Sequence, residues 1–165
     1  MFVHLRLHSE FSVVDGTIRL DEVVEAAAAD GQPALGLTDL SNLFGAIKFY
    51  KAARGAGVKP VLGAEVFVHG LGPDVAPGAS VQQQSLPRML LLVQSHQGYL
   101  NLCELLSRAW TRNMLRDQTA IKWEWLQELS EGLILLSGAH SGPVGLALLA
   151  GDEARAAELA QQLAA

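Results

Sequence analysis

The chain begins with strictly alternating residues, aliphatic at the odd positions and polar or basic at the even ones: Val3, Leu5 and Leu7 against His4, Arg6 and His8. Strict alternation is typical of a β-strand with two unlike faces, so the pattern predicts a strand over residues 3–8. One face would pack beneath helices. The other would carry two imidazoles, which suggest a metal site. Between them would stand an arginine, which is never a metal ligand.

Apolar runs with two different spacings follow along the rest of the chain. Apolar residues at helical spacing predict helices over residues 20–31, 43–57, 98–113, 122–130, 142–151 and 152–165. Short, largely apolar runs predict strands over residues 33–39, 59–70, 88–95 and 132–138. Residues 70–87 are rich in Gly, Pro, Ser and Gln, which predicts a surface loop.

Strands therefore alternate with helices about five times, which predicts an α/β fold with parallel strands and right-handed crossovers. The sheet would be either open and doubly wound or a βα barrel. In both, functional side chains lie at the C-terminal ends of the strands. Those ends are His8, residues 38–42, Glu65, residues 94–96 and the SGAHSG turn at 137–142. Because no strand follows residues 132–138, we expect the chain to be the N-terminal piece of something longer.

Composition narrows the function classes. The 165 residues fit one domain, half of them are hydrophobic, and the formal net charge is −5. This acidic balance argues against a general nucleic-acid clamp, which needs a clustered excess of Lys and Arg. No signal peptide and no apolar run of about 20 residues is present, so we expect a cytoplasmic protein without a membrane span. Glycine-rich nucleotide motifs, a serine-hydrolase elbow and paired-cysteine metal motifs are absent from the sequence.

Acidic residues accompany His8 at the predicted strand ends. Asp15 lies in the turn after the first strand, Asp39 ends the second, and Glu65 lies early in the third. Converging carboxylates and imidazoles are the ligands of hard or borderline divalent metals. Leu40, however, follows Asp39 where a further ligand would be expected. A metal site and a polar strand end bonded to backbone or solvent both remain open at this point.

Four stretches carry a family resemblance in this order: VHLRLHSEFSVVDG, PALGLTDLSNLFGAIKFYKAARGAGVKPVLGAEVFV, LLLVQSHQGYLNLCELLSRA and GLILLSG. They resemble the PHP (polymerase and histidinol phosphatase) domain, and more narrowly the N-terminal PHP domains of bacterial DNA polymerase III alpha subunits. The resemblance runs from Phe2 to about Gly151. It implies a distorted, TIM-like βα barrel with a metal pocket at the strand ends. Residues 1–165 would form its N-terminal part, truncated before the last strands.

The resemblance assigns the site position by position. His8, Asp15 and Glu65 match metal ligands of the family, and with Asp39 they would form the remnant of the pocket. Four positions have lost their ligands: Arg6 and Arg88 replace histidines, Leu40 replaces the histidine of the family's TDH motif, and Ala139 replaces a cysteine. The resemblance therefore implies no metal, no cofactor and no catalytic residue in this chain, although active members of the family use divalent metal.

Two functions follow from this resemblance. In the first, the chain is a structural module of a replicative DNA-directed DNA polymerase (a nucleotidyltransferase), and a separate proofreading exonuclease, the epsilon subunit, docks on it. Its partners would be the rest of the polymerase chain, epsilon, and DNA through the parent polymerase. In the alternative, the chain is a metal-dependent phosphoesterase or 3′–5′ exonuclease of the PHP family. Whether the chain is itself enzymatic is left open.

The two arginines suggest how a pocket without metal would be stabilised. Asp15, Asp39 and Glu65 would repel one another if no cation stood between them. A guanidinium stays protonated and offers five donors in a planar fork. We therefore expect Arg6 and Arg88 to stand in for the missing metals, each hydrogen-bonded to at least one of these carboxylates.

Overall fold

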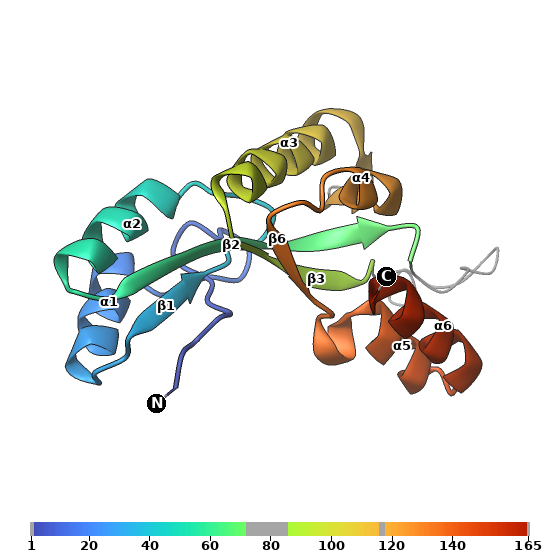
Figure 1. Cartoon of the computed structure of the whole chain (residues 1–165), viewed down its shortest axis with the longest axis horizontal. Coiled ribbons are helices and arrows are strands. Elements are labelled where there is room, and N and C mark those ends of the chain that lie inside the picture. The colour runs from blue at the N-terminus through green and yellow to red at the C-terminus, as the bar shows by residue number, and fades with distance from the viewer. Residues whose placement is uncertain (1, 72–85, 116–117, 165) are drawn as a thin grey trace.

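The computed structural model describes residues 2–71, 86–115 and 118–164, and these form a mixed α/β fold (Figure 1). This confirms the predicted fold class. The strands are β1 (Ala34–Leu37), β2 (Lys59–His69), β3 (Arg88–Val93), β4 (Met114–Leu115), β5 (Gln118–Lys122) and β6 (Leu133–Leu136). The helices are α1 (Leu20–Ala29), α2 (Ala46–Gly55), α3 (His96–Arg112), α4 (Trp123–Glu128), α5 (Pro143–Leu149) and α6 (Glu153–Ala164), with a 3-10 turn, η2, at Ala139–Ser141.

The strands follow the order β4-β5-β2-β3-β6, and β1 also pairs with β2. β1 runs parallel to β2, as predicted, and β5, a strand that the sequence did not predict, is also parallel to β2. β3 runs antiparallel to β2, and β6 antiparallel to β3, so the all-parallel prediction is wrong. Parallel neighbours need a crossover connection, usually a helix. The sequence offers no helix between β2 and β3, only the predicted loop over residues 70–87, of which 72–85 lie outside the described residues.

The N-terminal segment, residues 2–8, is not the predicted regular strand. Its carbonyls accept hydrogen bonds from β1 and the residue after it: Gly36 N–H donates to His4 (2.7 Å), and Thr38 N–H donates to Leu7 (2.9 Å). Three residues of the segment thus span two residues of the neighbouring strand. Leu7 N–H bonds the Thr38 hydroxyl at 2.9 Å instead of a backbone carbonyl. The extra residue breaks the two-faced alternation that the sequence predicted.

Two further features differ from the prediction. β4 and β5 form a short antiparallel pair, with Met114 opposite Thr119, that the sequence pattern did not indicate. Strands of two and five residues are too short for a clear period of two. The predicted helix over 122–130 is reduced to α4, because β5 extends to Lys122.

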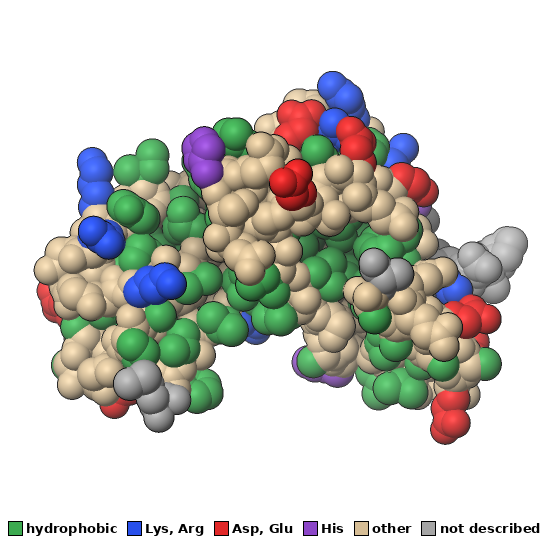
Figure 2. Space-filling view, viewed as in Figure 1, with side chains coloured by type: hydrophobic (Ala, Val, Ile, Leu, Met, Phe, Trp, Pro, Cys, Tyr) green, Lys and Arg blue, Asp and Glu red, His purple; other side chains and the backbone are tan. Residues whose placement is uncertain are grey.

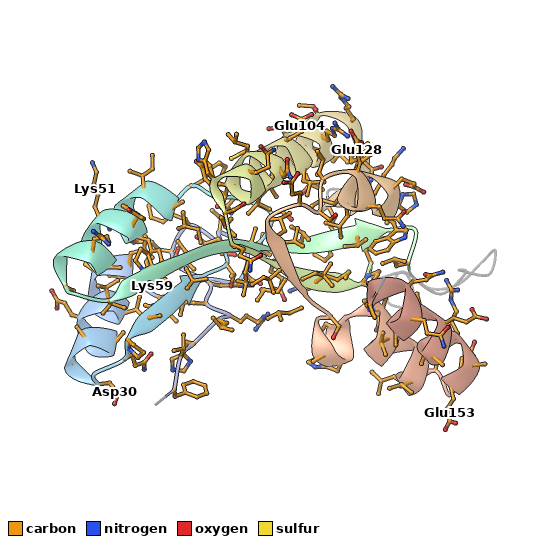
Figure 3. The ribbon with its side chains drawn as sticks, viewed as in Figure 1. Asp30, Lys51, Lys59, Glu104, Glu128 and Glu153 are labelled. Atoms are coloured by element: carbon orange, nitrogen blue, oxygen red, sulfur yellow. The ribbon has the colours of Figure 1, made fainter. Side chains whose placement is uncertain are left out.

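The core consists of two clusters that meet successive parts of β2. One joins β2, β3 and β5 to α3 and α6, and contains Val66, Met89, Leu91, Leu102, Leu105, Ile121 and Leu159. The other joins α1, β1 and α2, and contains Leu20, Val24, Leu35, Leu37 and Phe49. Arg108 ties α3 to α4 by an ion pair to Glu128 (2.7 Å) and pairs within α3 with Glu104 (2.8 Å); both glutamates are labelled in Figure 3. No helix among the described residues has both the length and the apolar character needed to cross a membrane.

Candidate functional site

The candidate site surrounds Glu65, in the middle of β2. Arg6 and His8 reach it from the N-terminal segment, which β1 holds in place. Asp15 comes from the turn that follows this segment. Arg88 comes from the first position of β3, where it pairs with Phe67, two residues beyond Glu65. Because β3 is antiparallel to β2, it is the beginning of β3 that lies at the site.

Glu65 is met by three basic side chains, although its own side chain is only 5% exposed. Arg6 forms a two-pronged contact, with Nε donating to Oε1 and Nη2 donating to Oε2, both at 3.0 Å. His8 Nε2 lies 2.9 Å from Oε2, although this contact lacks the alignment of a hydrogen bond. Arg88 Nη1 lies 3.7 Å from Oε2 and forms an ion pair without a hydrogen bond. The carboxylate is therefore surrounded by positive charge.

His8 lies between two carboxylates. Its Nδ1 is 3.0 Å from Asp15 Oδ1, and its Nε2 faces Glu65 on the other side of the ring. Asp15 also pairs with Arg88 at 3.6 Å and accepts a hydrogen bond of 2.7 Å from the Ser12 hydroxyl. An imidazole with a carboxylate near each nitrogen is favoured in its doubly protonated form, because the positive ring then lies between two negative charges.

The ionisation of these groups follows from their contacts. Burial alone would raise the pKa of Glu65, but the contacts with His8 and Arg6 outweigh it and lower the pKa to about 2. The contact with Glu65 raises the pKa of His8 above its usual 6.5, against the opposing effect of burial. The same carboxylate raises the pKa of Arg6 through their hydrogen bonds. Glu65 is therefore ionised and paired at neutral pH.

Asp39 is buried beside this network but is engaged elsewhere. Its Oδ1 accepts a hydrogen bond of 2.6 Å from Ser9 N–H, and its Oδ2 accepts one of 2.9 Å from the Ser9 hydroxyl. Burial raises the pKa of Asp39, and the bonds from Ser9 oppose that rise. Asp39 is therefore the one member of the predicted carboxylate group that neither arginine contacts, because a backbone amide and a hydroxyl already satisfy it.

The substituted positions all lie around Glu65. Arg6 and Arg88 face its carboxylate. Leu40 is its bridge partner in the backbone pairing, and its N–H donates to the Ser12 hydroxyl at 3.0 Å. Ala139 lines a cavity of about 450 Å³ together with Arg6 and Glu65. Four positions far apart in sequence thus lie around Glu65, and two of them, Arg6 and Arg88, contact its carboxylate.

Two other predictions concern where strand ends lie. The SGAHSG turn contributes Gly138 to Ser141 to the same cavity, as predicted. The prediction that residues 94–96 join the site is wrong, because the antiparallel orientation of β3 places its end at the opposite edge from Arg88. The sequence reasoning also missed Ser9 and Ser12, the hydroxyl donors to Asp39 and Asp15. The only signal for them was the polar HSEFS stretch.

A divalent metal does not fit these residues as they stand. His8, Asp15 and Glu65 each offer one ligand atom, and these atoms lie within 4.8 Å of one another. Arg6, however, occupies both oxygens of Glu65, and Arg88 lies within 3.7 Å. A cation bound to this carboxylate would have to share it with two guanidinium groups. The two arginines also match the charge of Glu65 and Asp15 without any metal.

The chain is similar to bacterial DNA polymerase III alpha subunits. It is 42% identical over 161 residues to the DNA polymerase III alpha subunit of Pseudomonas aeruginosa, covering 98% of this chain and 13% of that protein. It is also 42% identical over 153 residues to the alpha subunit of Escherichia coli, covering 93% of this chain and 12% of that protein. The chain thus spans about an eighth of the length of these relatives. An amidohydrolase structure from Chromobacterium violaceum has a TM-score of 0.46 and 24% identity over 65% of this chain and 32% of that one.

The family model named PHP domain matches residues 4–165, which is nearly the whole chain. It includes the segment that carries Arg6 and His8, the β2 position of Glu65 and the turn of Ala139. The chain therefore belongs to the PHP domain family.

Proposed function

We propose that this chain is the N-terminal PHP domain of a replicative DNA polymerase III alpha subunit whose metal pocket has become an ion-pair network. It would serve as a structural module and as the docking platform of a separate proofreading exonuclease subunit. The sequence identity to polymerase III alpha subunits supports the proposal that the chain is the N-terminal domain of such a subunit. Polymerase activity and DNA contact would belong to the rest of the parent chain, in the cytoplasm, and the strands described here would be the first part of a longer barrel.

One observation carries the proposal: the two-pronged contact of Arg6 on Glu65. A guanidinium does not lose its proton at any physiological pH, so it holds the carboxylate permanently. Bidentate pairs of this kind are among the stronger charge-assisted hydrogen bonds. Glu65 is thereby committed to a structural contact.

The test uses the purified full-length parent protein and a 5′-labelled single-stranded DNA. With Mn²⁺ or Zn²⁺ added, we expect no DNA hydrolysis that depends on His8 or Glu65. His8→Ala and Glu65→Gln should leave any residual hydrolysis unchanged. The variant Arg6→His should gain no metal, because Leu40 and Arg88 still occupy ligand positions. Loss of hydrolysis in either His8→Ala or Glu65→Gln would contradict the proposal.

Docking is tested separately by binding of the exonuclease subunit to the parent protein. Deletion of residues 1–165 should abolish that binding while the polymerase remains folded. Unchanged binding after the deletion would show that the exonuclease docks elsewhere.

A second function, metal-dependent phosphoester hydrolysis, is favoured by one observation. His8, Asp15 and Glu65 present ligand atoms within 4.8 Å of one another. Metal analysis of the purified protein separates the two functions, since near-stoichiometric zinc, manganese or iron would support hydrolysis. The ion-pair network predicts a metal content far below one ion per chain.

A further inference from the structure

We draw no further inference here: the strongest candidate, the apolar cavity of about 350 Å³ that Trp123 of α4, Leu133 of β6 and Leu163 of α6 help to line (Figure 2), carries nothing because nothing in the structure shows what covers it.

Discussion

Glu65 shows how one buried charge is stabilised by neighbours that are not themselves buried. Its side chain is 5% exposed, whereas that of Arg6 is 60% exposed and that of Arg88 is 33% exposed. A long arginine side chain can reach a buried carboxylate while part of its guanidinium remains hydrated. The free-energy cost of removing water from the guanidinium is therefore small. Arg6 makes the predicted hydrogen bonds. Arg88 does not: it forms ion pairs at 3.6 and 3.7 Å and stacks over the Phe67 ring, 4.9 Å from its centroid.

Arg6→Ala should lower the free energy of unfolding by about 1 kcal/mol, less than the roughly 1.5–3 kcal/mol of a buried charged hydrogen bond, because the guanidinium is largely solvated. The measurement is urea denaturation. Arg19→Ala is the matched control, since Arg19 is equally exposed but contacts Glu10 and Glu22 only at 3.8 and 3.7 Å. It should cost less than about 0.5 kcal/mol. Equal effects in the two variants would mean that the contact on Glu65 adds nothing to stability.

The ion pairs of His8 and Glu65 should contribute most to stability between about pH 4.5 and 6.5. The pKa of Glu65 is lowered from 4.5 to about 2, so its contribution is present above pH 4.5 and is lost as the pH falls toward 2. The pKa of His8 is raised above 6.5, so its contribution is present below pH 6.5 and is lost as the pH rises through the raised value.

Denaturation as a function of pH checks this prediction. Glu65→Gln removes one titrating group and the main cause of the raised pKa of His8. Its stability should therefore change less with pH than that of the parent, on both the acid and the alkaline side. Glu22→Gln, at an exposed carboxylate, is the control and should follow the parent curve. A Glu65→Gln curve parallel to that of the parent would contradict the assignment.

At the scale of elements, the N-terminal segment and β1 position the site through a close backbone approach. A Cβ on Gly36 would lie 2.8 Å from the carbonyl oxygen of Leu5 and 2.9 Å from its Cα. Only glycine lets the segment come this near. The same contact places Arg6 and His8, the next residues along, within reach of β2.

Gly36→Ala should therefore destabilise the protein by about 2 kcal/mol, because backbone atoms must move apart. The segment should also be released, which hydrogen exchange at residues 3–8 would detect. Gly55→Ala in α2 is the control: its Cβ would meet nothing within 4 Å, and alanine favours a helix by up to about 1 kcal/mol. Slow exchange at residues 3–8 in Gly36→Ala would show that the close approach is not what holds the segment.

At the scale of the whole molecule, β2 joins the parts. It pairs with β1, β3 and β5, and it contacts one hydrophobic cluster through Leu62 and the other through Ala64, Val66 and Val68. In Figure 1, α1 and α2 lie near one end of β2, and α3 and α4 lie near the other. Glu65 lies near its middle, so the site depends on both clusters. The N-terminal segment, by contrast, is held along one side only.

Native-state hydrogen exchange should reflect this arrangement. Amides in the centre of β2, such as Val66 and Val68, should exchange only on global unfolding, because opening them disrupts several strand pairs. Amides of residues 2–8 should exchange through a smaller local opening. The prediction is contradicted if residues 2–8 are protected as strongly as β2.

Several features of this protein were determined by local sequence alone. Hydrophobic periodicity predicted α1, α2, α3, β1, β2 and β3, because each pattern lies within one element. The residue types around Glu65, and the basic residues at positions 6 and 88, were also visible in the sequence. The PHP family could be identified from motifs that span the chain.

Other features of this protein were decided only by the tertiary structure, because they depend on contacts between residues that are distant in sequence. The antiparallel orientation of β3 brings Arg88 rather than residues 94–96 to Glu65, and strand direction leaves no trace in the pattern of a buried strand. The extra residue in the N-terminal segment and the turn of Asp39 toward Ser9 depend on hydrogen bonds across about 30 residues. A local pattern records which face of an element is apolar. It does not record which neighbour that face meets, because the pairing energy belongs to two separate stretches of chain.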